Sequence, residues 1–230
     1  GQGEDEYLGL TFGMKSTGFR LYKMDGTLSP SLVGGHNWAE YDMGGFRGIA
    51  ISKQLGIAMT LAYTTSERIY TWHLSNAGLS KWARTYTSSS ASSATDIVFD
   101  SATFSADGMY LFSNKNPGGS SSSDKTKVVK WQVVNVAGRL NMVGEYDLGE
   151  RIRNTCYCRS NGRDIVFAMS DSNIYAVDMS GSSGWGSYTI STYDQANLSY
   201  GAMCVSGLDI ATGSIILTVA SSINNDNSVD

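Results

Sequence analysis

The chain is poor in cysteine, proline and charged residues. It holds three cysteines and two prolines in 230 residues, and charged residues make up only 17%, where about 25% is typical of soluble domains. An odd number of cysteines argues against a disulfide scaffold. The net charge is −4 and no run of Lys and Arg occurs, so the sequence gives no electrostatic support for binding nucleic acid.

Long apolar runs and strong helical patterns are also missing. No stretch of about 20 apolar residues is present, which excludes a membrane-spanning helix, and residues 1–6 do not form a signal peptide. The first residue is not Met, which predicts a processed chain or a part of a longer one. Apolar residues reach 41%, enough for a core, and the Ser-, Thr-, Gly- and Asn-rich remainder is common in extracellular and virion proteins.

Four glycines recur at nearly constant spacing, each between two short apolar runs. Gly56, Gly108, Gly162 and Gly213 are separated by 52, 54 and 51 residues. Glycine supplies the positive φ that a tight hairpin turn needs, and a strand repeat of about 50 residues is typical of a β-propeller. We therefore predict an all-β fold, a β-propeller with about four to five four-stranded blades in this chain, either by itself or within a larger ring.

Each repeat is predicted to hold four strands. A short apolar strand lines the channel, the glycine turn leads to the second strand, and the third alternates aromatic and aliphatic residues, as in Ile69–Trp72. A pair of aromatic residues marks the fourth. The predicted blade parts are 7–43, 44–87, 94–148, 151–193 and 201–221, followed by a polar tail at 222–230.

The two ends of the chain both fall within a repeat. Residues 7–14 match a second strand, and the last unit stops after its second strand near Ser221, so closure as four blades leaves one strand over. Either the chain is part of a larger propeller, which we favour, or the surplus strand pairs with a neighbouring subunit. Both alternatives predict association with other protein subunits, as an oligomer or in a larger assembly.

The cysteines lie on predicted first strands. Cys156 and Cys158 flank Tyr157, so their side chains share one face of a strand and are poorly placed for a disulfide with each other. A bridge from either to Cys204 is conceivable, but we favour three small buried thiols.

Aromatic residues on the fourth strands are candidate ligand-binding residues. Trp38, Trp82 and Trp185 recur at the outer edge, where we favour packing against the neighbouring blade. If exposed, their flat faces would suit stacking on sugars. His36 follows two glycines in a predicted loop and is a further candidate, without an identifiable partner.

No catalytic residue and no cofactor is predicted. The sequence lacks the G-x-S-x-G motif that presents a nucleophilic serine. At the carboxyl end, Asn224, Asp226, Ser228 and Asp230 alternate as do the first ligands of a calcium loop. However, Val229 takes the place of the turn glycine and no bidentate Glu follows, so a polar tail is favoured over a metal site.

Two motifs carry a family resemblance. Phe104–Phe112 reads FSADGMYLF, and Ile69–Leu74 reads IYTWHL. These segments resemble the YVTN/lactonase-like β-propeller repeat and are similar to repeats in marine bacterial and phage-encoded propellers. The resemblance implies a propeller fold. Lactonase-like members bind metal through acidic residues or His at the channel mouth, a set that cannot be placed in this sequence.

These observations favour a non-enzymatic structural or recognition propeller that mediates protein–protein assembly. A virion component, such as a phage tail or capsid-associated protein, or a cell-surface component is the expected setting. A glycan-binding propeller that uses the outer tryptophans and a lactonase-like hydrolase are the alternatives. Neither nucleic-acid binding nor membrane insertion is predicted.

Overall fold

The computed structural model describes 18 strands and no helix within residues 6–11, 18–24, 30–36, 46–62, 68–75, 78–86, 97–98, 101–117, 126–134, 140–192, 202–209 and 214–220. None of these residues forms a helix of the length and hydropathy that crossing a membrane requires. The strands are β1 (Glu6–Thr11), β2 (Phe19–Met24), β3 (Ser31–His36), β4 (Phe46–Ser52), β5 (Ile57–Ala62), β6 (Arg68–Ser75), β7 (Gly78–Tyr86), β8 (Ile97–Val98), β9 (Ala102–Phe104), β10 (Tyr110–Pro117), β11 (Lys127–Val133), β12 (Leu140–Asp147), β13 (Ile152–Ser160), β14 (Arg163–Ser170), β15 (Asn173–Asp178), β16 (Gly186–Thr192), β17 (Ala202–Asp209) and β18 (Ser214–Ala220).

The strands form five antiparallel sheets in which neighbours along the chain pair with each other. We call them blades 1 to 5: β1–β3, β4–β7, β8–β12, β13–β16 and β17–β18. In blades 2 to 4 the first strand pairs only with the second, which places it at one edge of the sheet. The predicted all-β architecture of four-stranded units is confirmed for these three blades.

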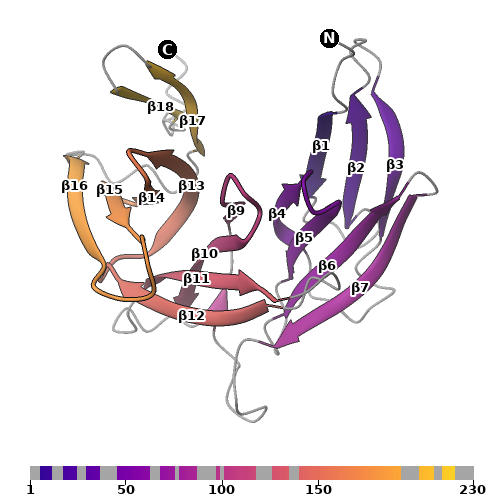
Figure 1. The fold of residues 1–230 in the computed structure, drawn as a ribbon, viewed down its shortest axis with the longest axis horizontal. Coiled ribbons are helices and arrows are strands. Elements are labelled where there is room, and N and C mark those ends of the chain that lie inside the picture. The colour runs from indigo at the N-terminus through magenta and orange to yellow at the C-terminus, as the bar shows by residue number, and fades with distance from the viewer. Residues whose placement is uncertain are drawn as a thin grey trace, which may run out of the picture.

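The blades follow one another around an arc (Figure 1). First strands of consecutive blades touch, so that β4 contacts β9, β9 contacts β13 and β13 contacts β17. Blade 1 has no strand in this position among the described residues. Instead β1 contacts β4 as β10 contacts β13, which identifies β1 as a second strand. Blades 1 and 5 lie at the two ends of the arc.

The repeated glycines have the backbone conformation that their spacing predicts. Gly56, Gly108 and Gly162 have φ of 62°, 71° and 77°, which costs glycine little and other residues more. Each lies in the turn between a first and a second strand. Gly213 falls outside the described residues.

The core consists of apolar contacts between adjacent blades. The cluster around Leu111 and Trp131 of blade 3 also contains Met59 and Ile69 of blade 2. Similar clusters join the other pairs of neighbours: blades 1 and 2 around Phe19 and Trp72, blades 3 and 4 around Phe112 and Val166, and blades 4 and 5 around Phe167 and Val205. Blades 2, 3 and 4 therefore bury both faces against their neighbours, and blades 1 and 5 each bury one face in these clusters.

Blades 2 and 3 each contain a buried tryptophan whose indole N–H is hydrogen-bonded to a side chain of the neighbouring strand. The Trp72 indole N–H donates to Thr60 Oγ1 at 2.8 Å, and that of Trp131 donates to Ser113 Oγ at 2.9 Å. In blade 4 the positions equivalent by strand register hold Val177 and Ala168, in place of both donor and acceptor.

The structure differs from one detail of the sequence prediction, and another lies outside the described residues. In blade 1 the described strands end with β3 at His36, and Trp38, predicted to lie on a fourth strand, falls outside the described residues. In blade 3 the two short strands β8 and β9 both pair with β10, where the repeat predicts a single first strand. Between them, the backbone N–H of Ser101 donates to the Asn114 side chain, so the ladder is interrupted there.

Two of the three predicted buried thiols are confirmed. Cys156 and Cys158 are both 9% exposed and belong to the cluster that joins blades 4 and 5. Their shared face is therefore the one that β17 covers. Burial raises the pKa of the Cys158 thiol, which keeps it protonated and unreactive. The Cys204 side chain lies outside the described residues.

Replacing Thr60 with Val removes the acceptor of the Trp72 indole N–H while keeping the shape of the side chain. We expect Thr60→Val to lower the free energy of unfolding by about 1–2 kcal/mol, because a buried donor is left unpaired. Denaturant titration measures this. Thr60→Ser keeps the hydroxyl and is the control, so it should retain the hydrogen bond to Trp72. A Thr60→Val variant as stable as the wild type would contradict the role assigned to this hydrogen bond.

Candidate interaction face

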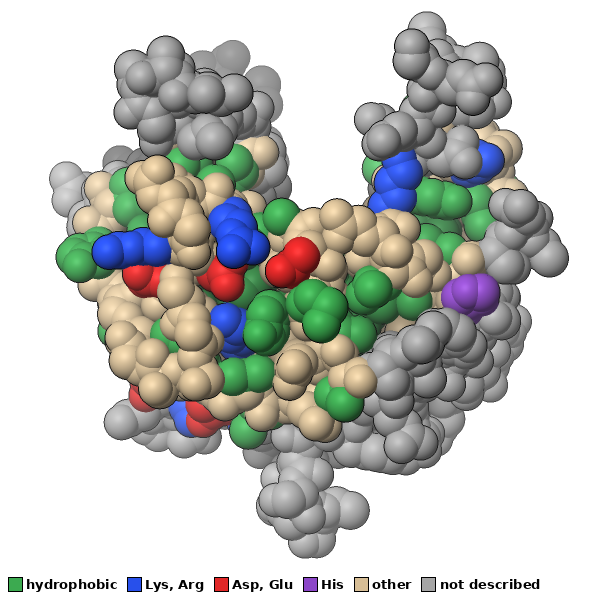
Figure 2. Space-filling view, in the orientation of Figure 1, with side chains coloured by type: hydrophobic (Ala, Val, Ile, Leu, Met, Phe, Trp, Pro, Cys, Tyr) green, Lys and Arg blue, Asp and Glu red, His purple; other side chains and the backbone are tan. Residues whose placement is uncertain are grey.

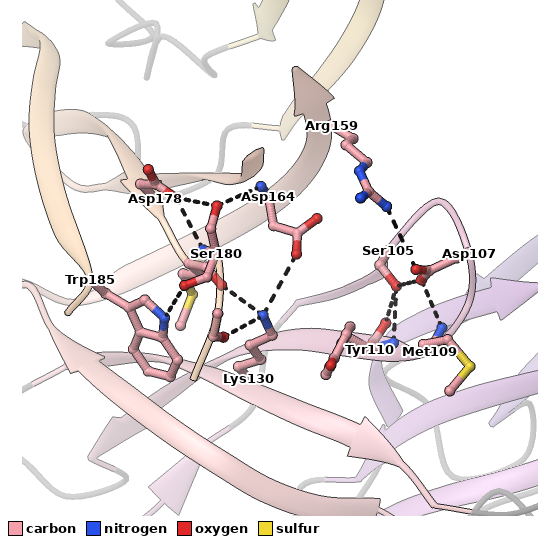
Figure 3. Close-up of polar contacts among 12 residues, drawn as sticks. Ser105, Asp107, Met109, Tyr110, Lys130, Arg159, Asp164, Asp178, Ser180 and Trp185 are labelled. Atoms are coloured by element: carbon pink, nitrogen blue, oxygen red, sulfur yellow. Dashed lines mark hydrogen bonds and ion pairs between the residues drawn. The ribbon is translucent and has the colours of Figure 1, made fainter. Parts of the chain in front are cut away.

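The turn between β9 and β10 is held by a serine and an aspartate (Figure 3). The Ser105 hydroxyl donates to the Asp107 carboxylate at 2.6 Å and accepts from the backbone N–H of Tyr110 at 2.9 Å. The backbone N–H of Met109 donates to the same carboxylate at 3.0 Å. The Ser105 hydrogen bond is the main cause that lowers the pKa of Asp107 below its usual value. The turn therefore presents an ionised carboxylate.

Three apolar side chains project from neighbouring turns beside this carboxylate. Leu55, Met109 and Val134 are 37%, 44% and 46% exposed. Leu55 lies so close to Gly108 that a Cβ there would be 3.2 Å from its Cγ, and the backbone N–H of Val133 donates to the Met109 carbonyl at 2.9 Å. The turns of blades 2 and 3 that carry these three exposed side chains are therefore next to one another.

Blade 4 adds a positive charge to the same surface. Arg159, on β13, lies with Nη1 3.7 Å from Oδ2 of Asp107, and both side chains are about half exposed. Because both side chains are about half exposed, their charges are accessible to a partner. An exposed ion pair of this kind adds little to stability. We call Leu55, Asp107, Met109, Val134 and Arg159 the turn face. Figure 2 shows hydrophobic, acidic and basic side chains mixed over the middle of the arc.

A groove lies between the first strands of blades 2 and 3. It encloses about 400 Å³ and is lined by residues 49–54 and 102–106. Leu55 and Asp107 directly follow these two segments, so the groove borders the turn face. Its volume falls within the range of small-ligand pockets. Ser52 and Ser105, which line it, both take part in turn hydrogen bonds.

A lysine is buried between blades 3 and 4. Lys130 is 1% exposed, and its ammonium group donates to the backbone carbonyls of Met179 at 2.7 Å and Gly181 at 2.9 Å. The same group lies 3.6 Å from Asp164 and 4.3 Å from the centre of the Tyr110 ring. Burial lowers the pKa of Lys130, and the charge of Asp164 opposes that shift. Lys130 thus joins two blades.

The carboxylate beside Lys130 is itself held by hydrogen bonds. The Tyr157 hydroxyl donates to Asp164 at 2.8 Å; burial and then this bond raise the pKa of Tyr157. The backbone N–H of Asp164 donates to the Ser180 hydroxyl at 2.9 Å. Figure 3 shows Asp164 directed at Lys130 and Ser180 directed at Asp178. These groups fix the start of β14 against blade 3.

Trp185, a candidate sugar-binding residue, contacts the neighbouring blade. Its indole N–H donates to the Ser180 carbonyl at 3.0 Å, and its ring lies so close to Gly144 of blade 3 that a Cβ there would be 2.8 Å from Cη2. This contact with the neighbouring blade is the one that the packing interpretation predicts for Trp185. The glycan-binding interpretation of Trp185 stays a prediction.

The other candidate residues lie at the limits of the described chain. β3 ends at His36 and β7 contains Trp82, but both side chains fall outside the described residues, as does Trp38. The same holds for the predicted metal ligands, Asn224, Asp226, Ser228 and Asp230. In the part of the chain that is described, no three His, Cys, Asp or Glu side chains are grouped so as to hold a metal ion.

The sequence pattern around Lys130 does not show whether this side chain points into the protein or toward solvent. The strand VVKWQV places a lysine at a position whose neighbours two residues away, Val128 and Gln132, differ in polarity. Only the contacts with blade 4 show that this lysine points inward. The turn face had a weaker signal, an apolar residue within or directly after a polar turn, at Leu55 and Met109.

Comparison with known proteins supports the fold. No protein-family model matches the chain, and no curated protein matches it. The solved structure of the Dos1 propeller is similar with a TM-score of 0.50 and 12% identity, over 94% of this chain and 49% of that one. A chain in the structure of the mitotic checkpoint complex has a TM-score of 0.49 and 14% identity, over 93% of this chain and 70% of that one.

The predicted β-propeller fold is confirmed by these sheets and by the first of these similarities. This chain spans about half the length of the Dos1 propeller chain. At 12% identity the likeness shows the fold alone, so the narrower resemblance to YVTN/lactonase-like repeats stays a prediction.

Removing the buried ammonium group should destabilise the joint between blades 3 and 4. We expect Lys130→Met to lower the free energy of unfolding by about 3 kcal/mol, because two carbonyls and a carboxylate lose their partner. Denaturant titration measures this.

Lys127→Met is the matched control on the same strand. Lys127 is 29% exposed and shares Glu145 with Lys115, so we expect a change below about 1 kcal/mol. Equal effects of the two substitutions would contradict the role assigned to Lys130.

Removing the Ser105 hydroxyl should change the pKa of Asp107. Because the pKa of Asp107 is lowered in the folded state, its ionised form stabilises the fold above pH 3.8, and this contribution is lost as the pH falls through the folded-state pKa. Ser105→Ala should raise the pKa of Asp107 toward 3.8, measured by carboxyl carbon NMR. Asp178, whose pKa is lowered by Ser180, should not change. An unaltered Asp107 titration would contradict this assignment.

Proposed function

We propose that this chain is a non-enzymatic protein-interaction propeller that binds a partner protein through the turn face. The observation that carries the proposal is the exposure of Leu55, Met109 and Val134 on adjoining turns. Apolar side chains that gather on a surface and are bordered by charges are typical of protein-binding sites. Methionine suits such a site because its flexible, polarisable side chain adapts to a partner.

The charges beside the apolar centre form a polar rim, which supports recognition of a partner protein. Asp107 and Arg159 are opposite charges supplied by different blades, so a partner with complementary charges would be oriented on both. The groove at residues 49–54 and 102–106 adds a concave element next to them. Together these features suit a folded protein surface with a protruding side chain or turn.

The non-enzymatic part of the proposal is supported by the use of the buried polar groups. Burial lowers the pKa of Lys130 and raises that of Tyr157, and shifted pKa values of this kind are also found at active sites. However, Lys130 bonds to two backbone carbonyls and to Asp164, and Asp164 also accepts from Tyr157. These bonds join strands of blades 3 and 4, which is a structural use.

We extend the proposal to assembly at a virion or cell surface, for which the low charge and the Ser-, Thr- and Asn-rich composition are the support. Glycan binding through the outer tryptophans and lactonase-like hydrolysis stay alternative predictions from the sequence. No contact of the described residues favours either over protein binding.

A charged residue at the centre of the turn face tests the proposal. The Met109→Asp variant and the wild-type chain, immobilised at equal density, are compared for proteins retained from an extract of the producing cells, quantified by mass spectrometry. We expect at least tenfold lower recovery of specific partners by Met109→Asp, about 1.4 kcal/mol or more in binding free energy.

Met142→Asp is the matched control, because Met142 is 52% exposed on the outer strand of the same blade, away from the turn face. It should retain the wild-type partners. If Met109→Asp retains them equally well, the turn face is not the binding site.

A further inference from the structure

Asn161 has a backbone conformation that, among the described residues, otherwise only glycines adopt. Its φ is 50°, in the left-handed region, and the φ of Gly162 is 77°. These two residues form the whole loop between β13 and β14, since Ser160 pairs directly with Arg163. A two-residue hairpin loop with positive φ at both positions favours Asn followed by Gly. The geometry of the turn therefore accounts for this dipeptide.

The dipeptide is open to solvent on all sides that matter for a reaction. Asn161, Gly162 and Arg163 are exposed, and a Cβ placed on Gly162 would meet no atom within 4 Å. Outside the strand ladder, neither Asn161 nor Gly162 has a hydrogen bond to another described residue. The side-chain amide and the backbone N–H after it are thus both accessible.

An asparagine that precedes glycine reacts with its own backbone. The backbone nitrogen of Gly162 attacks Cγ of Asn161, which closes a five-membered succinimide ring. The C–N bond of the side-chain amide breaks, and its nitrogen leaves as ammonia with the proton of the attacking N–H. Water then opens the ring at one of its two carbonyl carbons, giving aspartate or isoaspartate. Glycine favours ring closure because it has no Cβ to hinder the approach of its nitrogen.

Asn161 is distinguished from the other asparagines by sequence and by position. The chain contains a single Asn-Gly dipeptide. Asn141 is the closest comparison, because it is also exposed, but it lies within β12, pairs with Gln132 and is followed by Met142. A strand holds both the amide and the next backbone nitrogen apart, whereas the tip of a hairpin opens locally at little cost.

We propose that Asn161 is a site of spontaneous deamidation in the folded protein, which places a new carboxylate in the turn of blade 4. Arg159 lies two residues before it, on the same hairpin, with Nη1 3.7 Å from Oδ2 of Asp107 (Figure 3). The new carboxylate shares Arg159 with Asp107 and so reduces the positive charge of the turn face. The conversion itself does not depend on what that face binds.

Peptide mass spectrometry of the folded chain, kept for weeks in mildly alkaline buffer, tests the modification. Each conversion of an amide to an acid raises the mass of its peptide, and fragment spectra assign the residue. We expect conversion at Asn161 to be at least about tenfold faster than at Asn141. Because the turn must open for the ring to close, we expect the denatured chain to convert at Asn161 faster than the folded chain.

Asn161→Gly is the control that removes the reacting amide and keeps the turn, since Gly-Gly suits the same loop. Its peptide should show no conversion at this position, and circular dichroism should show the fold of the wild type. Two results would overturn the proposal: a folded chain that does not convert at Asn161 while the denatured chain does, or equal rates at Asn161 and Asn141.

The charge effect has its own measurement. Asn161→Asp has the sequence of one product, and Asp-Gly also suits this loop. Arg159 is among the causes that lower the pKa of Asp107, so a carboxylate that shares Arg159 should raise it. Carboxyl carbon NMR should therefore give a higher pKa for Asp107 in Asn161→Asp than in Asn161→Gly. Equal pKa values in the two variants would contradict the sharing of Arg159.

Discussion

Packing between the faces of adjacent blades is the interaction on which the rest of this structure depends. A sheet of two to four short strands cannot bury enough apolar surface alone, and each blade here places its largest apolar side chains against a neighbour. Stability is then shared along the arc, as in other repeat proteins. The position of every surface turn follows from this stacking, because the turns lie at the ends of strands whose faces are already occupied.

The joint between blades 3 and 4 combines this apolar packing with polar contacts on both sides of it. Lys130 reaches the carbonyls of Met179 and Gly181. Elsewhere in the same joint, the Asn114 amide donates to the Ile152 carbonyl, and the Ser101 hydroxyl bonds to Thr155. Apolar side chains permit many relative positions of two sheets, whereas buried hydrogen bonds are satisfied in one. These contacts therefore specify how blade 4 sits on blade 3, and with it the distance between Arg159 and Asp107.

The candidate site was only partly predictable from the sequence. The Ser105–Asp107–Gly108 turn could be recognised because its residues act locally, through hydrogen bonds within six positions of the chain. The grouping of Leu55 with Met109 could not, since these residues are 54 positions apart and meet only because blades 2 and 3 stack. Trp185 shows the opposite case: its spacing identified an aromatic position, but only the contact with Gly144 shows where the ring lies.

By itself the sequence determined the elements that local physics controls. The spacing of glycines with positive φ, the alternation of apolar residues and the near absence of proline specify short antiparallel strands joined by tight turns, and the repeat of about 50 residues specifies radial sheets. Tertiary structure alone decided which faces remain exposed. Lys127 and Lys130 lie on the same strand, yet one is 29% exposed and the other buried, because burial depends on whether another blade lies over the side chain.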